Sequence, residues 1–170
     1  MNTTGISQEQ SDVLVSLGMS LIATQTTERM MSLCLTHILQ LDGPLTLETL
    51  ERAKTRRRTL GQVIEKMRDK IDLDERFDAI LSEFLESRNL LAHRLSDVPG
   101  WGLNDAEGIA SAHKFLNRLF ALNSKITGTF GGLARAWARE NGWPLFPDVH
   151  GSDEAEKIVN FIFLERENSI

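Results

Sequence analysis

The chain has 170 residues, of which 41% are apolar and 25% are charged, and this is the size and composition of one soluble globular domain spanning residues 1–170. Its single cysteine, Cys34, excludes an internal disulfide and fits a reducing compartment, so we expect a cytoplasmic protein. The formal net charge of −5 is unevenly distributed, because the segment from Arg52 to Lys70 holds eight Lys or Arg residues against only Glu65 and Asp69.

The sequence indicates neither a membrane span nor a secretory signal. The longest apolar stretch, Val13 to Ala23, is interrupted by Ser16, Gly18 and Ser20, and it is much shorter than the roughly 20 residues that cross a bilayer. No basic residue precedes Arg29, whereas a secretory signal begins with a positively charged segment. We therefore expect no membrane partner.

The N-terminal part of the chain has helical spacing. Apolar residues recur every three or four positions from Ser7 to about Leu41, which predicts one long helix or two nearly collinear helices. These positions are Leu14, Leu17, Leu21, Met30, Met31, Cys34, Leu35 and Ile38. The cluster from Thr24 to Thr27 is the weak point, where we expect any break or kink to fall. Asp42-Gly43-Pro44 marks the end, because Gly and Pro are common just past a helix.

Two shorter helices are predicted next. Thr46 can cap a helix that runs to about Lys54, and Thr59 can cap a second helix from Leu60 to about Lys70. The inward-facing residues of the second helix are Leu60, Val63, Ile64 and Met67. The basic run between the two helices is Arg56, Arg57 and Arg58.

A central helix is predicted from Asp72 or Asp74 to about Asp97. Its apolar stripe consists of Phe77, Ile80, Leu81, Phe84, Leu85, Leu91, Ala92 and Leu95. Arg88 lies in the middle of this stripe, which is a costly place for a cation that cannot deprotonate. Asn89 and His93 lie one turn apart on a flank, and Leu90 lies further round. This pattern predicts a two-faced helix, with the stripe toward the core and the flank toward a second surface such as a partner subunit.

The C-terminal part is predicted to hold a long helix and a shorter one. Asn104 or Asp105 begins the long helix, which ends before Asn141-Gly142, and the last helix runs from about Ser152 to Glu167. Gly128, Gly131 and Gly132 interrupt the apolar stripe of the long helix, so we expect a kink, a split or close packing there. Without any strand alternation, the chain is predicted to be all-α, a bundle of about five to six helices with long first and fourth or fifth helices.

The segment Arg88-Asn89-x-x-x-His93 resembles the Arg-polar-x-x-x-His motif of the HEPN superfamily. The Leu-Ala-His run and the following Arg94-Leu95 are also similar to many bacterial members. The resemblance implies an HEPN-like helical bundle from a bacterial defence, toxin–antitoxin or RNA-processing system. It further implies a homodimer that cleaves RNA without a metal or other cofactor, with the motif helices of two protomers facing each other.

The three motif residues suit this chemistry. The 2′-hydroxyl of RNA can attack the neighbouring phosphodiester, and a histidine such as His93 can move a proton to or from the reacting oxygens. Arg88 can stabilise the additional negative charge of the transition state, and Asn89 can orient the imidazole or hold the 2′-hydroxyl. The expected product is a 2′,3′-cyclic phosphate. Further RNA contacts are expected from Arg56, Arg57, Arg58 and Arg94.

Several alternatives remain open from the sequence. Arg88 can pair with an acid from a neighbouring helix, and His93 can complement a helix C-terminus, in which case both serve only the fold. The chain is then a non-catalytic dimerisation or regulatory module that binds a protein partner, through Leu90 and the aromatic residues Phe161 and Phe163. The basic segment can be an RNA-binding surface without cleavage, or simply a solvated surface.

Two further expectations concern partners and metals. HEPN toxins with nucleotidyltransferase antitoxins carry a tyrosine shortly after the histidine, but Arg94, Leu95 and Ser96 follow here and the chain has no Tyr. An antitoxin is compatible with the resemblance, although not with this mode of regulation in its usual form. The remaining histidines, which are His37, His113 and His150, lack the spacing of metal ligands, so no metal site is expected.

Overall fold

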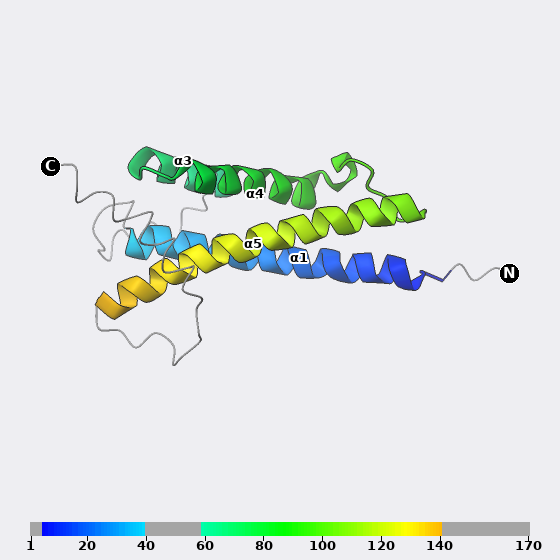
Figure 1. Ribbon diagram of the computed structural model, residues 1–170, viewed down its shortest axis with the longest axis horizontal. Helices are drawn as coiled ribbons and strands as arrows, with labels where there is room; N and C mark the ends of the chain where they lie inside the picture. The colour runs from blue at the N-terminus through cyan, green and yellow to red at the C-terminus, as the bar shows by residue number, and fades with distance from the viewer. Residues whose placement is uncertain (1–4, 40–58, 141–170) are drawn as a thin grey trace.

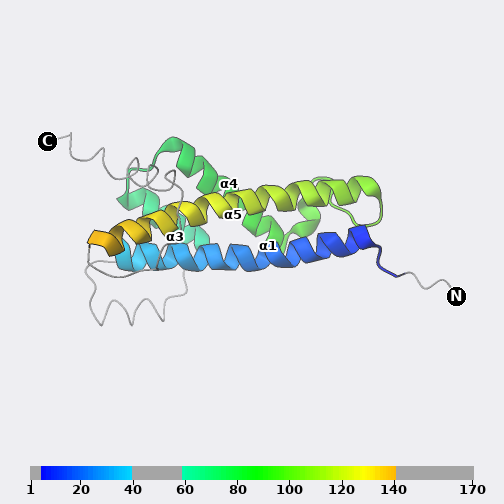
Figure 2. The same cartoon turned by 60° about the horizontal axis from the view of Figure 1, so that its bottom comes forward.

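The computed structural model describes residues 5–39 and 59–140, and within these ranges it contains four α-helices and no strand, which confirms the predicted all-α class. The α-helices are α1 (Gln8–Leu33), α3 (Leu60–Lys70), α4 (Glu75–His93) and α5 (Ala106–Glu140). α1 continues into a π-helical turn, η1 (Cys34–Ile38), and α4 is followed by a 3-10 turn, η2 (Leu95–Asp97). The long helices α1 and α5 lie side by side, and α3 and α4 cover them (Figures 1 and 2).

Several predicted features lie outside the described residues. These are the helix end at Asp42-Gly43-Pro44, the helix from Thr46 to Lys54, the basic run Arg56, Arg57 and Arg58, and the last helix from Ser152 to Glu167. None of the described helices is long and apolar enough to cross a membrane.

α1 and α5 run in the same direction and are held together by a buried polar layer as well as by apolar contacts. The side chain of Asn123 donates to Thr24 Oγ1 at 3.1 Å, and Thr27 Oγ1 donates to Asn123 Oδ1 at 2.8 Å. The prediction that the helix breaks or kinks between Thr24 and Thr27 is therefore wrong. These threonines remain helical because their hydroxyls find partners across the helix interface or on their own helix, as Thr26 does with the carbonyl of Ile22.

The irregular turn in the first helix occurs later than predicted. The backbone changes to π-helical geometry at Cys34–Ile38, where the Cys34 thiol is buried against the carbonyl of Phe130. A π turn inserts extra backbone into the helix and changes which side chains face the core. The N-terminal half of the prediction, a single long helix from Ser7, is confirmed by the Ser7 capping box.

The cap positions of α3 and α4 follow their sequence signals. Thr59 Oγ1 accepts a hydrogen bond from the Gln62 amide in a capping box, and Asp74, rather than Asp72, accepts from the first amides of α4. α4 ends at His93 instead of near Asp97, because Arg94 leaves helical geometry with φ −143° and ψ 44°. The chain then makes the 3-10 turn η2.

The core forms where α1, α4 and α5 meet. Phe77, Leu81, Phe84 and Leu91 of the predicted α4 stripe are buried, whereas Ala92, which was placed on the same stripe, is exposed near the helix end. From the other helices, the largest fully buried apolar residues are Val13, Met31, Ile64, Met67, Leu116, Leu119, Leu122 and Ile126.

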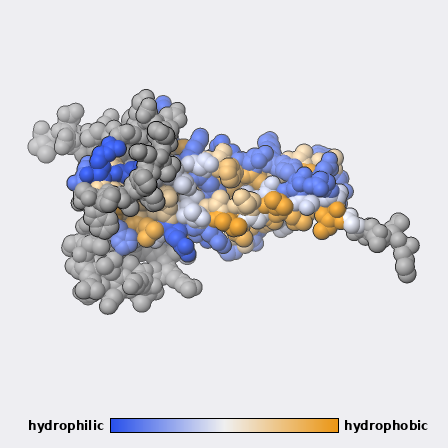
Figure 3. All heavy atoms as spheres, turned by 90° about the horizontal axis from the view of Figure 1, so that it is seen from below, coloured by the Kyte–Doolittle hydropathy of each residue, from blue (hydrophilic) through white to orange (hydrophobic). Residues whose placement is uncertain are grey.

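α5 is one continuous helix through Gly128, Gly131 and Gly132, so the predicted split there is wrong. Gly132 is buried, which fits the close-packing alternative. Glycine is also needed where the loop before α5 meets the first turn of that helix: Gly100 in the loop has a φ of +71°, and a Cβ on Gly108 of α5 would lie 2.8 Å from the Cα of Gly102. The face of the molecule on which α1 is exposed, opposite to α3 and α4, carries apolar residues among polar ones (Figure 3).

Candidate functional site

Arg88 lies where α4 crosses α1, and it forms an ion pair there with Glu28. The Nε of Arg88 donates to Glu28 Oε1 at 2.5 Å, and each side chain is about one quarter exposed, at 25% and 26%. This ion pair explains how a permanent cation is accommodated beside the buried residues Leu81 and Phe84. The pairing with an acid from a neighbouring helix was one of the sequence-based alternatives, and it is present.

The other two motif residues converge on the same guanidinium group. Nη1 of Arg88 donates to Asn89 Oδ1 at 3.2 Å and lies 3.4 Å from His93 Nε2. Within the described residues Nη2 makes no hydrogen bond, so it remains available to an oxygen ligand. Arg88, Asn89 and His93 therefore form one connected group around the guanidinium, although helical spacing predicted only Asn89 and His93 on the same flank.

The contact between Arg88 and His93 has a chemical consequence. A guanidinium N–H can only donate, so a hydrogen bond between the two groups requires His93 Nε2 to accept. In that arrangement the lone pair of Nε2 is directed at Arg88 and the ring proton lies on Nδ1. Since His93 is exposed in the last turn of α4, a substrate in solvent can reach the ring.

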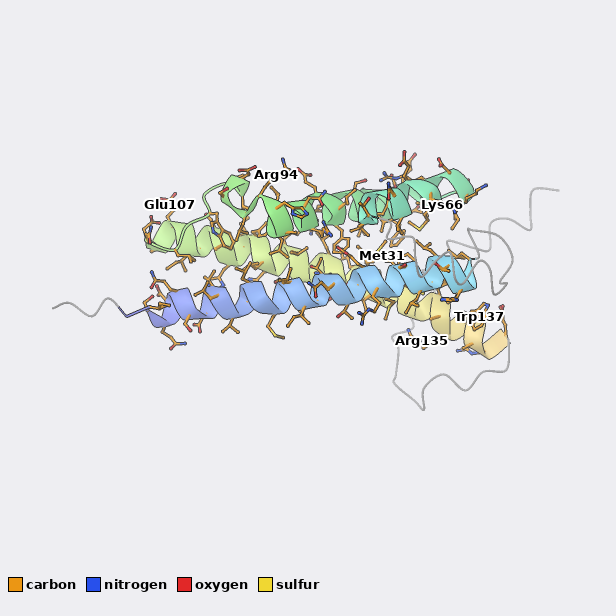
Figure 4. All side chains as sticks on the ribbon, turned by 180° about the vertical axis from the view of Figure 1, so that it is seen from behind. Met31, Lys66, Arg94, Glu107, Arg135 and Trp137 are labelled. Carbon is orange, nitrogen blue, oxygen red and sulfur yellow. The ribbon has the colours of Figure 1, made fainter. Side chains whose placement is uncertain are left out.

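The remaining candidates around the motif differ in placement. Arg94 is exposed directly after α4, where the chain leaves the helix (Figure 4). Leu90 is half-buried, and it is not among the strongly exposed apolar residues of the described chain. Arg56, Arg57 and Arg58 lie outside the described residues. In the part of the chain that the structure describes, no group of three or more His, Cys, Asp or Glu residues could hold a metal ion.

Glu28 is the residue of this group that sequence reasoning did not single out. The available signal was weak: Glu28 is the first charged residue after Asp12, at the end of a long uncharged stretch of α1. Its role depends on the register between α1 and α4, which are 60 residues apart at this contact. Only the assembled helices place its carboxylate against Arg88.

No family model, curated protein or solved structure matches the chain. The resemblance to the HEPN superfamily therefore rests on the Arg88–His93 motif and the all-α fold, and it stays a prediction.

Proposed function

We propose that the protein is an HEPN-like endoribonuclease that cleaves RNA without a metal ion, using Arg88, Asn89 and His93. The observation that carries this proposal is the convergence of the three side chains at a solvent-accessible helix end, with His93 Nε2 3.4 Å from Nη1 of Arg88. A cation with free donors beside a neutral imidazole suits a reaction in which a proton leaves and negative charge develops on phosphate oxygens.

The proposed reaction uses the substrate's own nucleophile. The 2′-oxygen attacks the adjacent phosphorus, its proton passes to Nε2 of His93 after Nη1 of Arg88 has turned from that nitrogen to the phosphate, and the bond between phosphorus and the 5′-oxygen breaks. The leaving 5′-oxygen takes a proton from solvent at this open site. The products are a 2′,3′-cyclic phosphate and a 5′-hydroxyl, and no oxidant, reductant or cofactor is consumed.

Arg88 and Glu28 have distinct roles in this proposal. Glu28 accepts from the Nε of the guanidinium, which fixes its plane and leaves Nη1 at the side where His93 lies. The charge of Glu28 also offsets that of Arg88, so a single ground-state phosphate is bound weakly. The extra charge of the transition state strengthens the contact, and this is the difference that accelerates a reaction.

Asn89 positions the arginine and contacts the substrate. Its Oδ1 accepts from Arg88 Nη1, which leaves the amide NH₂ group to donate to a ribose or phosphate oxygen. Arg94 and the basic run from Arg56 to Arg58 would supply further phosphate contacts. We propose that the enzyme is a homodimer that acts in a bacterial defence or toxin–antitoxin system, where a protein partner such as an antitoxin would inhibit its cleavage of RNA.

A second candidate function is a non-catalytic helical module that dimerises or binds a regulator. The ion pair between Arg88 and Glu28 favours it, because the pair gives Arg88 a purely structural role between α1 and α4. In that case Asn89 and His93 only neighbour the arginine.

Cleavage of a mixed pool of structured and unstructured RNAs in EDTA tests the choice. The wild-type protein should cleave, and His93→Ala should lose at least about 100-fold in rate, as expected when a general base is removed. His37→Ala is the matched control, since it removes a half-buried histidine of η1, nine residues beyond Glu28, and should cleave normally. Equal cleavage by wild type and His93→Ala, or none by folded wild type, would favour the non-catalytic module.

A further inference from the structure

The solvent face of α1 is unusually apolar for an exposed surface. Five apolar residues in two turns are between two fifths and two thirds exposed: Leu14 at 42%, Val15 at 63%, Met19 at 59%, Leu21 at 41% and Ile22 at 62%. Between Asp12 and Glu28 the helix carries no charged residue on any side. A helix without a charged face is normally covered on all sides, but α5 and α4 cover only part of α1.

The apolar residues are arranged symmetrically about Gly18. Leu14 and Val15 lie four and three positions before it, and Leu21 and Ile22 lie three and four positions after it. If a second α1 crosses the first antiparallel with a two-fold axis at Gly18, Leu14 faces Ile22 of the second copy and Val15 faces Leu21. Four of the five strongly exposed residues then meet an apolar partner, which is the self-complementarity that a two-fold interface needs.

Gly18 itself supports a close helix crossing. A Cβ at this position would meet nothing within 4 Å, so the protomer's own packing does not require glycine there. Glycine inside a helix is nevertheless costly, by about 1 kcal/mol relative to alanine. Its presence at the centre of the exposed apolar face is explained if another backbone approaches at this point, because the distance between helix axes is set by the side chains at the crossing.

The size of the face fits a dimer. The five residues together present on the order of 500 Å² per protomer, and a two-fold contact doubles this to roughly 1,000 Å², the lower bound for a specific interface. The flank of α4 is less suited, because Leu90 is half-buried and its neighbours Asn89, His93 and Arg94 are polar or charged.

We propose that a second copy of this chain binds the face formed by Leu14, Val15, Gly18, Met19, Leu21 and Ile22, with the two α1 helices crossing antiparallel at Gly18. This places the dimer contact on α1 instead of on the facing motif helices that the HEPN resemblance implies, and it leaves Asn89 and His93 open to solvent. The inference does not rest on RNA cleavage, because the dimer forms whether or not the motif is catalytic.

The first test measures the mass of the purified full-length protein by light scattering over a concentration series. Wild type should be a dimer, and Ile22→Lys should raise the dissociation constant more than about 100-fold, because the two-fold axis brings two desolvated ammonium groups into one interface. Leu33→Lys is the matched control: it lies on the same helix with a similar exposure of 52%, but about 22 Å along the axis from Gly18. It should remain a dimer, and circular dichroism should show that both variants keep their helices.

A cross-link tests the register of the crossing. Gly18→Cys in a Cys34→Ala background should form an intermolecular disulfide under mild oxidation, whereas Gln8→Cys in the same background should not. A monomeric wild type would overturn the proposal and assign the face to residues 141–170 or to another protein. A dimer unaffected by Ile22→Lys, or cross-linked equally well from Gln8→Cys, would overturn it too. His93→Ala should dimerise like wild type, so a failure of the nuclease proposal can be told apart from a failure of the dimer proposal.

Discussion

The ion pair between Glu28 and Arg88 joins the motif helix to the rest of the bundle, and its strength can be measured by a double-mutant cycle. Glu28→Gln removes the negative charge but retains a carbonyl oxygen, and Arg88→Met removes the positive charge but retains most of the apolar stem. The 2.5 Å contact and the exposure of about one quarter place the pair between a solvated surface pair and a buried one. We therefore expect a coupling free energy of about 1 kcal/mol.

Urea unfolding of the wild type, both single variants and the double variant gives this coupling from the four midpoints and slopes. The pair between Glu83 and Arg118 is the matched control, because it also joins two helices but is more exposed, at 39% and 54%. Its coupling should be smaller and should fall more steeply with added salt. A coupling below about 0.3 kcal/mol for Glu28 and Arg88 would refute the claim that Glu28 holds the guanidinium in place.

Three further predictions concern the rest of the bundle. Burial raises the pKa of the Cys34 thiol to about 11, so the folded state keeps its proton while the unfolded chain ionises from its ordinary pKa of 9.0. The contribution of this thiol to the free energy of unfolding should be fully present below pH 9.0 and fall by up to about 3 kcal/mol as the pH rises through 11, and unfolding of Cys34→Ala over this range should lack that loss. The Arg118 guanidinium lowers the pKa of Glu83. The ionised Glu83 therefore stabilises the fold above the ordinary carboxyl pKa, and this stabilisation is lost as the pH falls through the lowered pKa of Glu83. Urea unfolding of Glu83→Gln should show a weaker loss of stability with falling pH than wild type. Asn123→Ala should cost about 2 to 4 kcal/mol in urea unfolding, because it opens a cavity and removes the partner of Thr24; a cost below about 1 kcal/mol would contradict the buried polar layer.

The sequence predicted those parts of the fold that depend on local chemistry. Thr59 caps α3, and Asp74 caps α4, because each side-chain oxygen accepts from amides only two or three residues away. The inward residues of α3 follow from helical spacing in the same way. The end of α4 at His93 was missed by several residues, since a 3-10 turn continues the helical spacing after Arg94 has left α geometry.

The parts that could not be predicted depend on register between distant segments. The cluster from Thr24 to Thr27 has a low helix propensity, which predicts a break. Only the folded structure shows that Asn123, 99 residues beyond Thr24, is a buried hydrogen-bond partner for it. Glu28 was indistinguishable from any other acid for the same reason. Of the motif residues, the proximity of Asn89 and His93 followed from their spacing on one helix, whereas the turn of the Arg88 guanidinium toward them depends on its contact with Glu28.

The most direct test of the proposed function uses one defined RNA that the protein cleaves in EDTA, and the same RNA with a 2′-deoxy nucleotide at the cleaved position. If Arg88, Asn89 and His93 act through the 2′-hydroxyl, the all-ribose RNA should yield a 2′,3′-cyclic phosphate and a 5′-hydroxyl, and the substituted RNA should stay intact at that position. Cleavage of the deoxy-substituted site, a product with a 5′-phosphate, or intact RNA after incubation with folded wild-type protein would contradict the account.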